Sequence, residues 1–228
     1  MKNIIFIAPP AAGKGTISSM ICSKYNIPHI SIGEIFRDEI SKSTKNASKI
    51  KEAMYKGVLV DDDITAKVIK KRLTNSDCKK GFIMDGYPRS MVQANLFDSI
   101  LKELSYDECL VILLDISKEE ALKRTMSRLT CQKCNISYNT SNPDLSPIRD
   151  GICDLCSENL TRRKDDTEEM FEVRYNIYIN ETCQVIDYYR NKNQLVVIDA
   201  TYKSPDEIFE EIKKVIKWLL LRVIMSYH

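Results

Sequence analysis

The stretch Ile4-Ile5-Phe6-Ile7-Ala8-Pro9-Pro10-Ala11-Ala12-Gly13-Lys14-Gly15-Thr16 joins a short apolar run to a helical pattern that covers residues 17–25. A short apolar run bounded by turn residues is typical of a buried parallel strand. The loop that follows would point backbone N–H groups and a helix N-terminus at an anion. Lys14 would reach the terminal phosphates of a nucleotide, and the Thr16 hydroxyl would lie near Mg²⁺. The segment therefore predicts a phosphate-binding loop that opens an α/β fold.

Two alanines depart from the glycine pattern of such loops. Ala8 stands where the first Gly is expected, and Ala11 replaces another. A Cβ atom narrows the loop and makes a positive φ costly. The simpler interpretation, a strand-to-helix turn with an incidental lysine, therefore stays open on this segment alone.

Further apolar runs alternate with helical patterns along the sequence. Three are bounded by polar residues, at 82–85, 110–115 and 195–199, and the short segment His29-Ile30-Ser31 is a fifth strand candidate. Strands that alternate with helices form parallel sheets with right-handed crossovers. We therefore predict a doubly wound, five-stranded parallel sheet with two insertions, a helical one after residue 30 and one with paired cysteines near residues 130–166.

The C-terminal region predicts a closing helix. From Pro205 onward, apolar residues recur at helical spacing, and Asp206 and Glu207 lie in the first turn. Residues 218–225 are apolar on almost every side. Either the helix continues over the core, or this tail is an exposed patch for a partner, a second copy or a membrane surface.

Charge and composition exclude several classes of protein. Among 228 residues, Lys plus Arg number 34 and Asp plus Glu 32, so the overall field is too weak to bring the protein onto nucleic acid. Met1 leads directly into the first strand, which leaves no room for a cleavable signal. No run of 18 apolar residues offers a spanning helix. We therefore expect a cytoplasmic monomer without a nucleic-acid partner.

Four of the eight cysteines form two C-x-x-C pairs, whereas the others are scattered. The paired cysteines are Cys131, Cys134, Cys153 and Cys156. Their spacing predicts a structural, tetrahedral Zn²⁺ site with no open coordination position. Two alternatives are weaker: disulfides, which a reducing compartment disfavours, and a nucleic-acid-binding zinc ribbon, because acidic residues offset the basic ones in this segment.

A second motif closes the strand at residues 82–85. Asp85 emerges at the carboxyl end of the sheet, where it can orient the water ligands of Mg²⁺, and Arg89 can hold a phosphate with two hydrogen bonds. Arg37 supplies a second guanidinium. The sequence has only two histidines and no apparent Ser/His/Asp arrangement, which agrees with chemistry based on charge stabilisation.

With these residues in hand, the sequence resembles the adenylate kinase family from Met1 to about Lys217. The family loop G-x-P-x-x-G-K-G-T matches residues 8–16 except at the first Gly, and the motif D-G-[FY]-P-R is intact at residues 85–89. Gln93 falls where the family contacts the AMP base. Residues 162–166 resemble the lid motif R-x-D-D, and Arg174 follows at the family spacing.

The resemblance implies Mg²⁺-dependent, reversible phosphoryl transfer from ATP to AMP. The implied catalytic residues are Lys14, Asp85, Arg89, Arg128, Arg163, Asp165 and Arg174. The implied donor-nucleotide residues are Gly13, Lys14, Gly15, Thr16, Arg124, Arg128 and Tyr138. The implied AMP residues are Ile32, Arg37, Met54, Leu59, Val60, Gly86, Arg89, Gln93, Arg163 and Arg174. Thr16 and Asp85 would hold Mg²⁺, partly through water.

The resemblance also implies a division of the protein into parts. Residues 1–30, 62–128 and 167–228 would form the core, residues 31–61 the AMP-binding segment, and residues 129–166 a zinc-stapled lid. Three departures qualify the match: Ile32 replaces the usual Thr, and the lid lacks the His after Tyr138 and the Phe before Asn142-Pro143. Two alternatives stay open, GTP as the donor and a nucleotide-binding module with little turnover.

Overall fold

The computed structural model describes residues 3–134 and 136–225, with side chains described up to residue 218. Its central sheet is parallel, in the order β2-β3-β1-β4-β8. The strands are β1 (Ile4–Ile7), β2 (His29–Ser31), β3 (Ile83–Asp85), β4 (Leu110–Asp115) and β8 (Leu195–Asp199). The predicted α/β class and all five predicted strands are confirmed.

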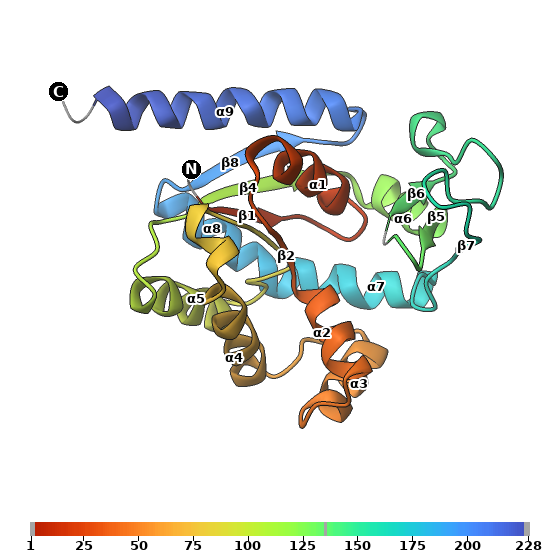
Figure 1. Ribbon diagram of the computed structural model, residues 1–228, viewed down its shortest axis with the longest axis horizontal. Coiled ribbons are helices and arrows are strands. Elements are labelled where there is room, and N and C mark those ends of the chain that lie inside the picture. Colours follow the sequence, from red (N-terminus) through yellow and green to blue (C-terminus); the bar gives the residue numbers. More distant parts are fainter. Residues whose placement is uncertain (1–2, 135, 226–228) are drawn as a thin grey trace.

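Helices cover both faces of this sheet, because alternate residues of each strand point to opposite sides. On one face, Ile5 packs with residues of α4 (Asp62–Leu73), α5 (Met91–Glu103) and α8 (Cys183–Asn191). On the other, Ile4 and Phe6 pack with α1 (Lys14–Tyr25) and α9 (Pro205–Met225). Figure 1 shows α1 and α9 on one side of the strands and α4, α5 and α8 on the other.

The helical insertion, residues 31–61, contains α2 (Ile32–Ser41) and α3 (Ala47–Lys56). Although these helices project from the sheet (Figure 1), their apolar side chains are continuous with the main core. Ile32, Phe36, Ile50 and Val60 are buried in the same cluster as the strand residues. The insertion is therefore held by ordinary hydrophobic packing.

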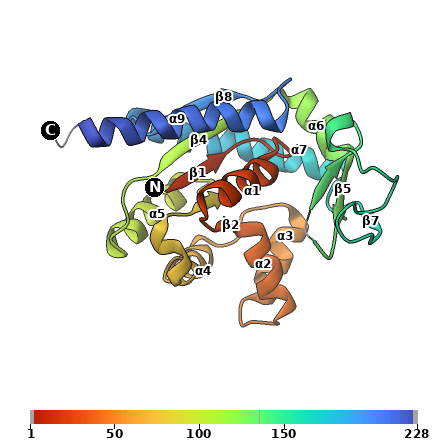
Figure 2. The ribbon, with the colours of Figure 1, turned by 45° about the horizontal axis from the view of Figure 1, so that its top comes forward.

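The cysteine segment, residues 129–166, is built differently. A small antiparallel sheet, in the order β6-β5-β7, is formed by β5 (Arg128–Cys131), β6 (Ser137–Asn139) and β7 (Leu160–Thr161). Its buried apolar residues, Cys131, Tyr138 and Cys153, form a separate cluster. A single 3-10 turn, η2 (Pro143–Leu145), follows β6. Figure 2 shows this sheet at the end of the molecule opposite the C-terminus.

The remaining elements connect these parts. α6 (Lys118–Met126) leads into the cysteine segment, and α7 (Glu168–Ile177) leads out of it. A π-helical turn at Tyr178–Thr182 joins α7 to α8, and a 3-10 turn, η1 (Ser76–Lys80), precedes β3.

The predicted closing helix is α9, which continues past Lys217 to Met225. Ile208, Ile212 and Ile216 are buried along one stripe, whereas Trp218 is 54% exposed. Of the predicted apolar tail at residues 218–225, only Trp218 has a described side chain, so the choice between core helix and exposed patch lies outside the described side chains. Among the residues that the structure describes, no helix combines the length and apolarity needed to span a bilayer.

Candidate active site

A cavity of about 720 Å³ lies where the carboxyl ends of β1, β2 and β3 meet the helical insertion and the cysteine segment. Every predicted nucleotide-site residue borders it, although they come from segments scattered between residues 13 and 174. The carboxyl edge of a parallel sheet is where such folds bind ligands. The structure thus brings these side chains together, while the individual roles remain predictions.

The loop between β1 and α1 is shaped by two residues in the left-handed region. Gly13 has φ 90°, and Ala11 has φ 57°. Ala11 therefore adopts the conformation that favours glycine, at a cost of about 1–2 kcal/mol. The alanine that weakened the sequence match does not prevent the turn.

Lys14, the first residue of α1, is half-buried at the centre of this loop. Its Nζ lies 3.4 Å from the Ala8 carbonyl oxygen and 3.5 Å from that of Pro9. Burial lowers the pKa of Lys14, and the carboxylate of Asp85 opposes part of this shift. These long contacts leave the ammonium group able to bind an anion that enters the cavity.

Asp85, the last residue of β3, is the carboxylate that acts on Lys14 in this way. Burial opposes its ionisation, but the hydrogen bond from His29 and the charge of Lys14 outweigh it and keep the pKa of Asp85 below its usual value. His29 Nε2 lies 3.3 Å from Asp85 Oδ2. An ionised carboxylate and the Thr16 hydroxyl on one cavity are the kind of oxygen donors that Mg²⁺ prefers, so these residues fit the metal. His29 was not among the predicted site residues.

Gly86 and Arg89 form a tight turn after β3. Gly86 has φ 80°, and a Cβ atom there would lie 2.9 Å from Arg89 Nη2 and 3.1 Å from Ile32 Cγ2. Arg89 Nε donates to the Gly86 carbonyl at 2.8 Å. The positive φ favours glycine at this position, and the absence of a side chain leaves room for the guanidinium at the cavity wall.

Gln93 is almost fully buried, and both ends of its amide have protein partners. Oε1 accepts a hydrogen bond from the Arg89 backbone N–H at 2.8 Å, and Nε2 donates to Asp62 Oδ1 at 2.9 Å. The reverse orientation would set two N–H groups against each other. Asp62 was missed by the sequence reasoning, because a first-turn aspartate of a helix is common and carries no signal of its own.

Arginines from the edges of the cysteine segment complete the cavity. Arg128 pairs with Asp166 through two hydrogen bonds, of which Nε to Oδ2 is 2.8 Å, and Arg174 pairs with Asp165. Arg163 lies within 4 Å of no carboxylate oxygen of the described residues, and burial, with the charges of Arg128 and Arg37, lowers its pKa to about 10. Guanidinium groups that lie this close together form a site for polyanions.

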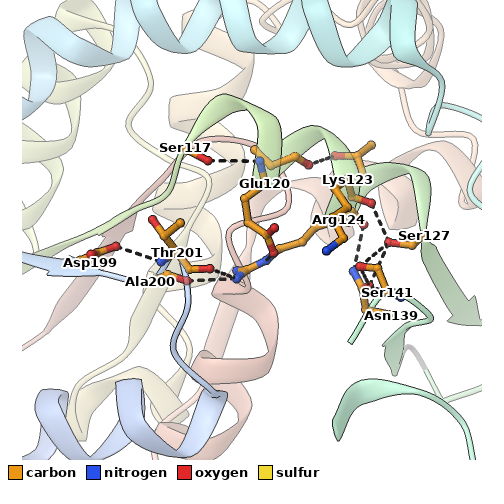
Figure 3. Close-up of polar contacts among 12 residues, drawn as sticks. Ser117, Glu120, Lys123, Arg124, Ser127, Asn139, Ser141, Asp199, Ala200 and Thr201 are labelled. Carbon is orange, nitrogen blue, oxygen red and sulfur yellow. Dashed lines mark hydrogen bonds and ion pairs between the residues drawn. The ribbon is translucent and has the colours of Figure 1, made fainter. Parts of the chain in front are cut away.

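Arg124 and Tyr138 are held more firmly than the sequence suggested (Figure 3 shows Arg124). Arg124 Nη2 donates to the carbonyl oxygens of Ala200 and Thr201, at 3.0 and 2.9 Å. The Tyr138 hydroxyl accepts from the Asp154 N–H at 2.9 Å and lies 3.5 Å from Cys153 Sγ. Each therefore has only a ring or guanidinium face to offer to a nucleotide.

The paired cysteines of the cysteine segment converge, with their four sulfur atoms within 4.8 Å of one another. Four thiolates at about 2.3 Å from one zinc ion stand about 3.8 Å apart, so the residues fit this metal. The Tyr138 hydrogen bond lowers the pKa of Cys153 to about 6, whereas the hydrogen bond with Cys156 raises the pKa of Cys134 to about 12. A divalent cation would stabilise all four thiolates.

Comparisons with known proteins identify the family. The family model described as adenylate kinase matches residues 6–194. An adenylate kinase of Clostridium tetani is 42% identical over 214 residues, 94% of this chain and 98% of the relative. One of Thermosipho melanesiensis is 40% identical over 215 residues, 94% of this chain and 99% of the relative. One of Thermotoga neapolitana is 42% identical over 219 residues, 96% of this chain and 98% of the relative. The protein therefore belongs to the adenylate kinase family, a family of phosphotransferases.

Proposed function

We propose that this protein transfers the terminal phosphoryl group of ATP reversibly to AMP. The observation that carries the proposal is the convergence of Lys14, Arg89 and Arg128 on one cavity that also contains Asp85. Phosphoryl transfer requires positioning of the two nucleotides and stabilisation of charge on the moving group. A cavity with more cationic than anionic side chains supplies both.

The proposed donor side comprises the loop at residues 8–16, Arg124 and Arg128. The N-terminus of α1 and its backbone N–H groups bind the phosphates, with Lys14 on the terminal ones. Mg²⁺, held by Thr16 and through water by Asp85, would neutralise charge on the donor phosphates. Arg163 and Arg174 bring further positive charge, and Asp165 orients Arg174.

The proposed acceptor side lies against the helical insertion. Arg37 and Arg89 bind the AMP phosphate, and the Gln93 amide faces the base. Ile32, Met54, Leu59 and Val60 form the apolar wall around that base. Since Ile32 offers no hydrogen bond, recognition of adenine rests on Gln93 and on shape.

The cysteine segment is proposed as a lid with a structural zinc ion, and residues 31–61 as the AMP-binding segment. A rigid lid that closes over the donor excludes water and limits hydrolysis. We also propose that the protein works as a cytoplasmic monomer.

A coupled assay tests the proposal by presenting AMP with ATP, GTP, CTP or UTP in turn, and ATP with AMP, CMP or UMP. We expect AMP to be the preferred acceptor and ATP the preferred donor. A preference for GTP would replace ATP with the alternative donor, because a guanidinium face stacks on either purine. A preference for CMP or UMP would contradict the acceptor assignment.

Lys14→Met tests turnover within the same assay. Loss of a charge partner of the transition state in a buried site should lower kcat by about 10²–10³. Lys24→Met, at an exposed position of the same helix, is the matched control and should retain activity. Equal turnover of both variants would contradict the role of the loop, and an inactive wild type that still binds nucleotides would favour the binding module.

A further inference from the structure

The side chain of Asn139, the last residue of β6, joins three parts of the protein (Figure 3). Its Nδ2 donates to the Arg124 carbonyl oxygen at 3.0 Å. Its Oδ1 accepts from Ser141, through the backbone N–H at 3.0 Å and the hydroxyl at 2.7 Å, and lies 2.9 Å from the Ser127 hydroxyl oxygen. Both ends of the amide are therefore used in contacts between β6, the end of α6 and the turn after β6.

The Arg124 carbonyl needs such a partner. It lies in the last turn of α6, where carbonyl groups have no N–H partner within the helix. Ser127 donates to the neighbouring carbonyl oxygen, that of Lys123, through the Ser127 N–H at 3.1 Å and the Ser127 hydroxyl at 2.6 Å. Asn139, a residue of the small antiparallel sheet, thus caps the C-terminus of α6. The orientation of its amide is fixed because an oxygen cannot donate to a carbonyl.

The side chain of Arg124 is anchored in another direction. Its guanidinium donates to Ala200 and Thr201 in the turn after β8, and to Glu120 Oε1 at 2.7 Å. Figure 3 shows the arginine between that turn and the Asn139 group. The backbone of Arg124 is therefore held by the cysteine segment while its side chain is held by the central sheet.

Arg128 is also connected to Asn139, through the backbone. In the β5–β6 ladder it stands directly opposite Asn139, and the Thr140 N–H donates to the Ser127 carbonyl at 3.0 Å. The two arginines of the proposed donor side thus flank the contacts that Asn139 makes. A change in those contacts would alter the angle between α6 and β5, and with it the spacing of the two guanidinium groups.

We propose that Asn139 is a positioning residue for the donor nucleotide, acting through Arg124 and Arg128. The inference rests on the proposed donor role of these arginines. Asn139 also borders the cavity, so a direct contact with the donor is the competing explanation, and the experiment must separate the two.

Asn139→Ala should raise the KM for ATP about tenfold and leave kcat within about twofold, since a positioning hydrogen bond is lost but no transition-state charge partner. Calorimetric titration should show unchanged AMP affinity. Asn139→Asp, which keeps the acceptor oxygens but sets one against the Arg124 carbonyl, should show the same loss. The matched control is Gln132→Ala, which removes only an exposed contact between the turn after β5 and β7, from Gln132 Nε2 to Thr161 Oγ1 at 2.9 Å, and should leave KM unchanged.

A combined variant decides between the two explanations. If Asn139 acts through Arg124 and Arg128, adding Asn139→Ala to a variant that carries both Arg124→Ala and Arg128→Ala should raise the KM for ATP no further, whereas an independent contact would multiply the KM by its own factor. Multiplying effects, an unchanged KM in Asn139→Ala, or equal losses of ATP and AMP affinity would each overturn the proposal. If the wild type showed no transfer, the proposed function would fail, and calorimetric ATP affinities of the same variants would still decide the role of Asn139.

Discussion

The helical insertion and the cysteine segment border the same cavity, yet they are stabilised in opposite ways. Phe36 and Ile50 of the insertion are buried in the main hydrophobic cluster, together with strand residues. The cysteine segment has a separate cluster around Cys131, Tyr138 and Cys153. The insertion therefore shares the stability of the sheet, whereas the cysteine segment depends on its own small cluster and on whatever binds the four sulfur atoms.

This difference in packing predicts that the two regions can be destabilised separately. A change that damages the helical insertion should weaken the whole fold, because the two share one core. A change that damages the zinc site should release only the cysteine segment, since its buried apolar residues form a cluster of their own. Damage to the cysteine segment should therefore weaken binding of the donor, whereas damage to the helical insertion should weaken binding of the acceptor.

The largest expected effect is on the zinc content of the protein. Cys153→Ser with Cys156→Ser removes half of the ligands, and structural zinc sites contribute about 10–16 kcal/mol in small zinc-binding peptides. We expect about one zinc per protein molecule in the wild type and none in the variant, loss of most activity, and AMP affinity within about threefold. Elemental analysis and calorimetric titration of AMP measure these quantities. Lys133→Ser, an exposed change between two ligands, should retain the metal.

Collapse of AMP affinity in step with donor affinity, in a variant shown to remain folded, would contradict the separation. A wild-type protein that contains no zinc and has a reducible Cys–Cys bond instead would contradict the zinc assignment.

An intermediate effect is expected in the helical insertion. Phe36→Ala empties a buried position in the main cluster and should lower the free energy of unfolding by about 3–5 kcal/mol. Because Arg37 is the next residue, AMP affinity should fall as well, while zinc content stays the same. Urea denaturation and the titration above provide the measurements. Tyr55→Ala, at a position 86% exposed in α3, should change unfolding by less than about 0.5 kcal/mol.

Retained global stability in Phe36→Ala would mean that the insertion folds independently, and the contrast between the two regions would be lost.

Sequence patterns predicted the features that depend on neighbouring residues. Strand positions followed from apolar runs, and the end of β3 at Asp85 followed from a local motif. The partners of Arg124 could not be predicted in this way, because Ala200 and Thr201 lie 76 and 77 positions away and contribute only backbone carbonyls. Any residue has such a carbonyl, so no side-chain signal exists.

The contacts of Asn139 could not be predicted from the sequence either. The sequence marked its position only as a departure from the family, whereas its partners are again carbonyl and hydroxyl groups that a pattern does not reveal. The Ala11 conformation was also beyond the sequence, because the cost of a left-handed alanine is small enough for the surrounding loop to impose it.

The smallest effects are expected from a pair of glycines with similar backbone angles. Gly57, after α3, has φ 69°, and a Cβ atom there would lie 2.6 Å from Met170 Cε; Gly151, in the cysteine segment, has φ 70° and open space around it. Gly57→Ala should lower the free energy of unfolding by about 1–2 kcal/mol, from backbone strain and crowding against α7. Gly151→Ala carries the same strain, but only within the cysteine segment, and should leave the main calorimetric transition unchanged.

A shift of the main transition of about 2–4 °C per kcal/mol is measurable by differential scanning calorimetry. Equal shifts for Gly57→Ala and Gly151→Ala would show that the cysteine segment unfolds together with the core.

The strand order has a consequence for the protein as it leaves the ribosome. β1 is synthesised first but lies in the middle of the sheet, between β3 and β4, so both of its neighbours exist only once residue 115 has been made. By then β2, β3, β1 and β4 are all present, while the cysteine segment and the edge strand β8 are still to come. Translation at about 5–20 residues per second gives these four strands several seconds to associate. The four paired cysteines are therefore synthesised after these four strands, and the last strand made needs only a single neighbour.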